Sequence, residues 1–146
     1  MKLFTIGFTK KTAETFFSLL RVNGVQRLID IRLRPEGQLA GFARQHDLAY
    51  FLAQLINCDY YHLPLLTPSQ DILADYRRDH DWNSYVRRFE ALMDERDVPA
   101  SLDARLFEDK RCCLLCSEAT TEQCHRRLVA ERLVQHWPDV EVVHIV

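Results

Sequence analysis

A run of five apolar residues, Cys112–Cys116, constrains the fold of this chain more than any other segment. A strand at the surface of a protein alternates polar and apolar side chains, whereas this run carries a polar residue on neither face. Strands that are apolar on both faces occur in parallel sheets that helices cover from both sides. The run therefore predicts a central strand of a parallel sheet in an α/β fold.

Strands and amphipathic helices alternate along the rest of the chain. Strand patterns cover residues 3–6, 27–32, 60–63 and 141–145. Helical spacing of apolar residues covers 13–20, 48–56, 70–76, 82–93, 99–106 and 120–136. This alternation implies right-handed crossovers between parallel strands. We expect a single α/β domain over residues 1–146, a three-layer α/β/α fold of the Rossmann-like or flavodoxin-like kind, with a mainly parallel sheet of about five strands.

Capping residues predict where several of these helices begin. Thr12, Asp47 and Ser69 are the expected N-caps of the first three helices. Thr120 and Gln123 have the spacing of a capping box, so the 120–136 helix is expected to begin at Thr120.

The composition limits the classes of partner. A net charge of -2 argues against broad electrostatic attraction to nucleic acid or an anionic membrane, although it is compatible with a local basic patch. No run approaches the roughly 18 apolar residues of a membrane span, and the start Met1–Gly7 is too short an apolar run for a signal peptide. The odd number of cysteines in a chain that is large enough to fold without disulfides indicates reduced thiols and a cytoplasmic protein.

Polar and reactive side chains follow the predicted strands at their carboxyl ends. In open parallel sheets these ends form the rim where ligands bind. The loops expected on this rim cover residues 7–9, 30–34, 62–64 and 116–126. We therefore expect one site on the rim, where guanidinium groups lie beside groups that exchange protons.

Arginines and a helix start predict an anion site there. The candidate anion-binding residues, which would hold phosphate beside the N–H groups of the 120–136 helix, are Arg32, Arg34 and Arg126. The candidate catalytic residues are Asp30, Glu118, Cys124 and His125. At the helix start, Cys124 is expected to have a lowered pKa and to be a reactive thiolate. Structural alternatives remain open, in which Asp30 and Arg32 form an ion pair and Cys124 packs inward.

Cysteine spacing raises the question of a metal site. Cys113 and Cys116 match a C-x-x-C spacing, but residues three apart on a regular strand point to opposite faces. This pair is therefore not expected to hold one metal or to form a redox dithiol, and Cys112 and Cys113 are expected in the core. No cofactor is predicted, with one alternative, which is a zinc site built from Cys116, Cys124 and His125.

Several segments resemble a known family in their order along the chain. They are Thr5–Gly7, Asp30–Pro35, Phe42, Tyr61–Pro64, Leu114–Glu118 and Cys124–Arg126. Nearly from end to end, the chain resembles the family catalogued as domain of unknown function 488. The resemblance implies a compact α/β domain of bacteria and archaea without an established activity. It places signature positions at Gly7, Asp30, Arg32, Pro35, His62, Pro64, Cys116, Glu118, Cys124, His125 and Arg126. The chain departs from the family pattern at Phe8, Thr9, Gly37 and 65–69.

Three functions of different classes agree with these features. The first is an enzyme that acts on a small phosphate-bearing ligand such as a nucleotide, or on nucleic acid. The second is redox or sulfur chemistry through Cys124, with Cys116 as its resolving partner. The third is a non-catalytic binding module. The sequence does not identify a protein partner, and it leaves open whether the chain is an enzyme.

Overall fold

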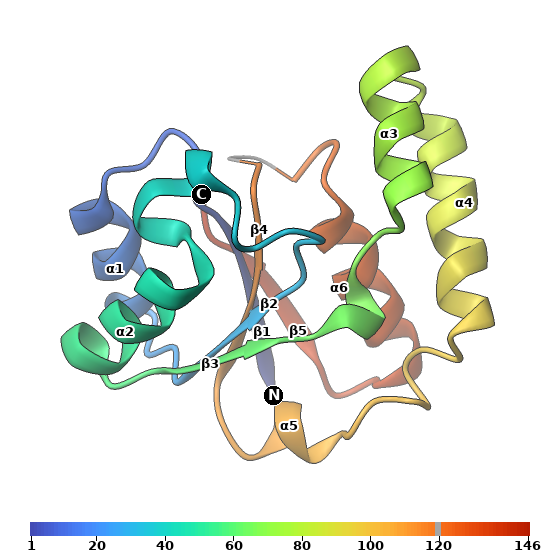
Figure 1. Cartoon of the computed structure of the whole chain (residues 1–146). Helices are drawn as coiled ribbons and strands as arrows, with labels where there is room; N and C mark the ends of the chain where they lie inside the picture. The colour runs from blue at the N-terminus through green and yellow to red at the C-terminus, as the bar shows by residue number, and fades with distance from the viewer. Residues whose placement is uncertain (119–120) are drawn as a thin grey trace.

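Five parallel strands form one sheet in the computed structural model, which describes residues 1–118 and 121–146 (Figure 1). The strands are β1 (Lys2–Gly7), β2 (Arg27–Asp30), β3 (Asp59–His62), β4 (Cys112–Cys116) and β5 (Glu141–His144). Their order in the sheet is β3-β2-β4-β1-β5, so the apolar run forms the central strand as predicted. This order differs from the Rossmann order 3-2-1-4-5-6 and from the flavodoxin order 2-1-3-4-5.

Helices cover both faces of the sheet and complete the predicted three-layer α/β/α fold (Figure 1). On one face lie α1 (Ala13–Val22) and α2 (Gln45–Ile56), and on the other lie α3 (Gln70–Asp79), α4 (Trp82–Glu95) and α6 (His125–His136). The short α5 (Arg105–Glu108) precedes β4. Two short 3-10 helices are η1 (Gln38–Ala43) and η2 (Pro64–Leu66). In the described residues, no helix has the length and apolar character that crossing a membrane requires.

The side chains of β4 divide between two hydrophobic cores. Cys112 and Leu114 pack in the core under α4 and α6, whereas Cys113 and Leu115 pack in the core under α1 and α2. Cys116 continues this alternation, because its Sγ contacts His125 of α6. The two cysteines of the C-x-x-C spacing therefore point to opposite faces, as strand geometry predicted.

Two of the predicted helix starts are confirmed by hydrogen bonds. The Thr12 hydroxyl accepts from the backbone N–H of Thr15, and the Ser69 hydroxyl accepts from the N–H of Ile72. The prediction for Asp47 is wrong, because the N-cap of α2 is Arg44, three residues earlier, and Asp47 lies in the first turn of the helix. An aspartate stabilises a helix at the N-cap and also in the first turn, where its negative charge interacts favourably with the helix dipole. The N-cap and the first turn are therefore hard to distinguish from sequence.

The 120–136 helix begins later than predicted. Cys124 is the N-cap of α6, and its first helical residue is His125. Thr120, the expected cap, lies outside the described residues. Gln123 precedes the helix, and its Oε1 accepts a hydrogen bond of 2.8 Å from the hydroxyl of Tyr76. The Gln123 side chain therefore contacts α3 instead of bonding to the helix start, as a capping box requires.

Two further boundaries differ from the prediction. β2 ends at Asp30 rather than at residue 32, because the Asp30 carboxylate accepts the backbone N–H of Arg32 and turns the chain there. Pro99 does not open a helix. It follows a cis peptide bond in a turn, and α5 begins only at Arg105.

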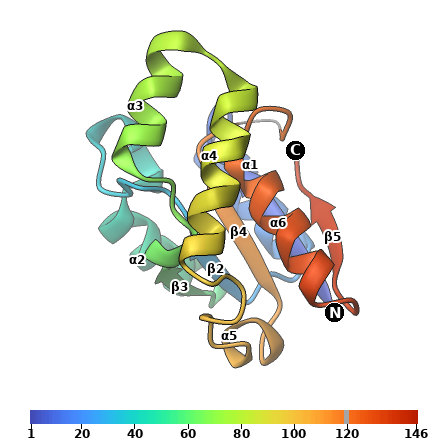
Figure 2. The same ribbon diagram turned by 90° about the vertical axis from the view of Figure 1, so that its right-hand side faces the viewer.

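The chain leaves the neighbouring strands β2 and β4 toward opposite faces of the sheet. After β2 it runs to η1 and α2, and after β4 it runs to α6 (Figure 2). In open α/β sheets such a divergence opens a crevice at the carboxyl ends of the two strands, and ligands bind there. The hairpin of α3 and α4 extends past the same end of the sheet (Figure 2). The fold thus provides a site between two loops and a helical hairpin.

Candidate functional site

A pocket of about 950 Å³ lies at this divergence. Its lining comes from the end of β4, from the loops that follow β1, β2 and β4, from α3 and α4, and from the start of α6. Ligand pockets commonly have volumes of about 300–1,000 Å³, so this one has room for a small molecule. Six residues predicted for the site line it, namely Arg32, Arg34, Cys116, Glu118, Cys124 and His125.

Arg32 is held in place by a fully buried carboxylate. Its Nε and Nη2 donate to the two oxygens of Asp30 at 2.9 and 2.7 Å, and Nη2 also donates to the carbonyl of Ala43 at 2.8 Å. The Tyr60 hydroxyl donates to the same carboxylate at 2.5 Å. The ring of Phe8 lies 5.3 Å from the guanidinium carbon. Arg32 thus reaches the pocket with a fixed orientation.

The electrostatics of this pair favour the charged guanidinium. Burial opposes the charge on Arg32, but the hydrogen bonds and the charge of Asp30 outweigh it, so the pKa of Arg32 is raised above its ordinary value. Within the described part of the chain, Nη1 is the guanidinium nitrogen of Arg32 that makes no hydrogen bond. Asp30 itself is fully buried behind Arg32 and does not line the pocket. Its contacts are those of a residue that positions Arg32.

The mouth of the pocket carries exposed charges. Arg34, from the loop after β2, and Arg77, from α3, are both exposed and form no ion pair with the described residues. Glu118 is also exposed there, in the loop after β4. With the buried Arg32, the described residues of the lining include three guanidiniums and one carboxylate. The balance of fixed charge in the pocket is therefore positive.

A thiol and an imidazole meet at the buried end of the pocket. Cys116 Sγ lies 3.3 Å from Nδ1 of His125, and Nε2 of the same ring lies 2.7 Å from the carbonyl oxygen of Ile31. A carbonyl only accepts hydrogen bonds, so Nε2 carries a proton and donates it. In a neutral ring Nδ1 then has a lone pair that faces Cys116.

Cys124 completes this group. The ligand atoms of Cys116, Cys124 and His125 all lie within 4.8 Å of one another, and all three residues are buried. The hydrogen bond from Cys124, with those from the N–H groups of Ser117 and Glu118, lowers the pKa of Cys116. The pKa of Cys124 is raised by the same contact with Cys116 and by burial. This direction is opposite to the one predicted for Cys124, because the thiolate is stabilised on its neighbour instead.

Arg126 lies behind the pocket wall rather than on it. It is fully buried, and its Nη1 donates to the backbone carbonyl of Glu118 and lies 3.9 Å from Cys124 Sγ. A Cβ atom added to Gly7 would lie 1.6 Å from that carbonyl oxygen and 2.6 Å from Nη1 of Arg126. The glycine at the end of β1 is therefore required for the loop after β4 to pack as it does.

An aromatic wall was missed in the sequence. Trp82 and Tyr85 of α4 are stacked with ring centroids 4.8 Å apart, and Tyr76 of α3 meets both edge to face. All three line the pocket. The helical spacing of Trp82, Tyr85 and Phe89 is typical of core packing, which Tyr85 and Phe89 also provide. The periodicity could not show that the first turn of α4 extends past the sheet, where the same stripe faces the pocket.

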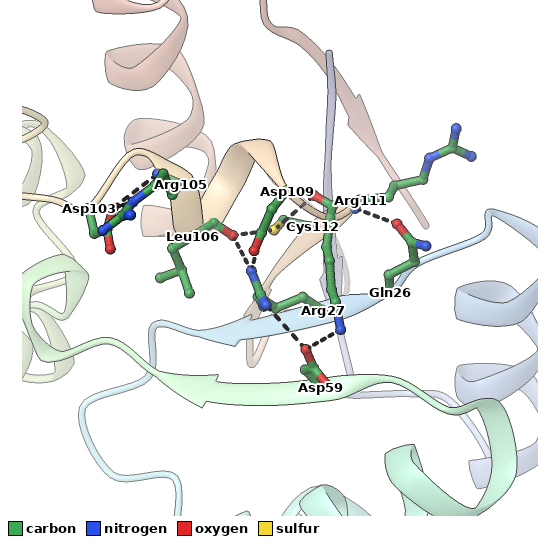
Figure 3. A network of polar contacts seen from close by, with 10 residues as sticks. Gln26, Arg27, Asp59, Asp103, Arg105, Leu106, Asp109, Arg111 and Cys112 are labelled. Carbon is green, nitrogen blue, oxygen red and sulfur yellow. Dashed lines mark hydrogen bonds and ion pairs between the residues drawn. The ribbon is translucent and has the colours of Figure 1, made fainter.

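A second polar network lies at the opposite, amino ends of β2 and β3 (Figure 3). Arg27 donates to Asp109 at 2.6 Å, to the carbonyl of Leu106 at 2.7 Å and to Asp59 at 3.2 Å. Lys110 also pairs with Asp59 at 2.7 Å. These contacts join α5 to the sheet edge, and the network has no part in the pocket.

Comparison with known proteins assigns the chain to a family through its sequence. The family model described as domain of unknown function DUF488 matches residues 12–133. The comparison with curated proteins gave no match, and the comparison with solved structures gave none. The match includes the loops after β2 and β4 and the start of α6, which supply most of the pocket residues predicted from the sequence. The chain belongs to the family of domain of unknown function DUF488.

Proposed function

We propose that the pocket binds a small phosphate-bearing substrate of the nucleotide class and that the protein acts on it as an enzyme. The observation that carries the proposal is the Arg32 clamp. A buried carboxylate orients one guanidinium toward a pocket whose mouth has two more, Arg34 and Arg77. Planar guanidiniums are the side chains best suited to bind phosphate through paired hydrogen bonds.

The aromatic side chains that line the pocket support a nucleotide rather than inorganic phosphate. Tyr76, Trp82 and Tyr85 present aromatic side chains on α3 and α4. A nucleobase stacks on such side chains with a gain of about 1–3 kcal/mol. A pocket of about 950 Å³ has room for a base, a sugar and phosphates together.

Proton transfer on the ligand is assigned to Glu118, whose carboxylate lies at the mouth of the pocket. Carboxylates are common general acids and bases. His125 lines the buried end, where its Nε2 donates to the Ile31 carbonyl and its Nδ1 faces Cys116, so its ring acts on that thiol. Cys116 and Cys124 lie beside His125, so thiol chemistry on the bound ligand is the second candidate, favoured by the 3.3 Å contact between Cys116 and His125.

Calorimetry with a panel of nucleotides, oligonucleotides and inorganic phosphate tests the binding. Arg34→Gln and Arg77→Gln remove exposed charges and should leave the fold intact. Each should weaken nucleotide binding by roughly 10- to 100-fold, the equivalent of one charge-assisted hydrogen bond of about 1.5–3 kcal/mol. Arg78→Gln is the matched control, because Arg78 is also exposed on α3 but does not line the pocket.

Two further results separate the alternatives. Trp82→Ala should weaken nucleotide binding and leave the binding of inorganic phosphate unchanged, because only the base stacks on the wall. A product detected by chromatography after incubation would establish turnover, whereas tight binding without any product would favour a non-catalytic module. If no member of the panel binds, or if Arg34→Gln, Arg77→Gln and Arg78→Gln behave alike, the proposal fails.

A further inference from the structure

We propose that Cys116, Cys124 and His125 bind a zinc ion at the buried end of the pocket, with a fourth coordination position open to the ligand. Their ligand atoms lie within 4.8 Å of one another, and all three residues line the pocket. Two thiolates and an imidazole are ligands that zinc accepts at tetrahedral sites. The metal site stands by itself and does not depend on the identity of the substrate.

The separation between the Cys116 sulfur and the His125 imidazole agrees with such a centre. With zinc–sulfur and zinc–nitrogen bonds of about 2.3 and 2.1 Å, tetrahedral geometry places a sulfur and a nitrogen ligand about 3.6 Å apart. Cys116 Sγ and His125 Nδ1 are 3.3 Å apart. These two atoms already have the separation that a shared ion needs. Cys124 is the N-cap of α6 and has extended backbone dihedrals, so its thiol is not held to helical geometry.

The histidine has the orientation of a metal ligand. Its Nε2 donates to the Ile31 carbonyl at 2.7 Å, which leaves Nδ1 to face the two thiols. Metal-binding histidines usually donate the other ring N–H to a carbonyl or carboxylate, which fixes both the tautomer and the ring. His125 is buried, and the ring of Phe89 packs against its edge with centroids 5.6 Å apart.

One buried positive charge lies beside the two thiols. The guanidinium of the fully buried Arg126 has its Nη1 3.9 Å from Cys124 Sγ. Two thiolates without a cation would be costly in this buried setting, whereas a divalent ion balances them. Cys113 cannot take part, because it packs on the other face of β4.

The number of ligands points to a reactive centre rather than a structural one. Structural zinc sites have four protein ligands, whereas catalytic sites have three and keep one position for water or substrate. Among residues 1–118 and 121–146, the group contains three candidate ligands. If the proposed nucleotide function holds, the ion would polarise a phosphoryl oxygen or a water molecule near Arg32. This role of the ion rests on the proposed function, whereas the metal site does not.

Metal analysis of the full chain, purified without chelator or a histidine tag, tests the site. We expect about one zinc ion per chain, and we expect Co²⁺ to replace it with a thiolate-to-cobalt charge-transfer band. Cys116→Ala, Cys124→Ala and His125→Ala should each lose stoichiometric metal. Cys113→Ala is the matched control, because it removes a buried thiol from the same strand and should retain the metal.

The wild-type protein gives a second measurement that does not depend on whether a variant folds. Removing the metal with a chelator should expose Cys116 and Cys124 to alkylation, and adding Zn²⁺ should protect them again. Protein that stays metal-free after incubation with Zn²⁺, or alkylation that does not respond to chelator and Zn²⁺, would overturn the site. Arg34→Gln and Arg77→Gln should retain full metal content, so a failure of nucleotide binding is distinguishable from a failure of metal binding.

Discussion

Removal of the Asp30 carboxylate should be among the most destabilising single changes in this protein. In Asp30→Ala, the guanidinium of Arg32 stays buried but loses two hydrogen bonds to the carboxylate. The backbone N–H of Arg32 loses a third, and the Tyr60 hydroxyl loses its acceptor. Breaking a buried ion pair from one side costs about 3–5 kcal/mol. The whole domain is stable by only about 5–15 kcal/mol, so the effect is large. For a domain of this length, we expect the melting temperature to fall by roughly 6–20 °C.

A double-mutant cycle separates the lost pair from the lost side chain. Asp30→Ala/Arg32→Met removes both charges, so the buried guanidinium that makes the single variant costly is gone. We expect the double variant to be more stable than the sum of the two single variants predicts, by about 0.5–3 kcal/mol. Asp47→Ala is the surface control. Its ion pair with Arg44 is about half exposed and should contribute less than about 1 kcal/mol.

Urea unfolding followed by circular dichroism measures all four variants. The midpoints give the differences in the free energy of unfolding, and an unchanged slope shows that each variant unfolds as the wild type does. A cost below about 1 kcal/mol for Asp30→Ala would refute the reasoning, because a guanidinium that stays buried without its carboxylate partner should cost more than that. Strict additivity in the cycle would refute it as well.

Three further predictions concern other parts of the fold. Gly7→Ala should cost about 1–3 kcal/mol and weaken ligand binding, measured by melting and calorimetry, because its Cβ would lie 1.6 Å from the Glu118 carbonyl oxygen. Burial lowers the pKa of His144, so its contribution to stability is present above about pH 6.5 and is lost as the pH falls toward the folded pKa; His144→Asn should flatten that part of the urea-midpoint profile. Burial raises the pKa of Cys112 to about 11, so mass spectrometry should find it alkylated only after unfolding.

The layers of the fold were predictable because they follow from side-chain patterns within single elements. The apolar Cys112–Cys116 run required cover on both faces, and the structure gives it the centre of the sheet. Local hydrogen bonds also made Thr12 and Ser69 predictable as caps. The strand order was not predictable, because it depends on which strands pair across the whole chain. For the same reason, contact between Gln123 and Tyr76 could not be expected from a capping-box spacing.

The candidate site was predictable in position and less so in detail. Strand ends marked Arg32, Glu118 and His125, and the structure gathers all three around one pocket. Sequence could not show that Asp30 would be enclosed behind Arg32, because either member of such a pair can face a ligand. Sequence also could not show that the pKa of Cys116 is lowered while that of Cys124 is raised. These directions depend on backbone N–H groups of the loop after β4, which donate to Cys116 and not to Cys124.

One short segment joins the two halves of the proposed site. The Ile31 carbonyl accepts from His125, and the next residue, Arg32, is the guanidinium oriented toward the pocket. The proposed metal ligand and the proposed anion ligand are therefore fixed to adjacent residues of one loop. A change that moves this loop should perturb both, and Cys124→Ala should weaken anion binding as well through loss of the metal, whereas Arg34→Gln should perturb anion binding alone. That contrast follows from the divergence of β2 and β4, which brings the loop after β2 against the start of α6.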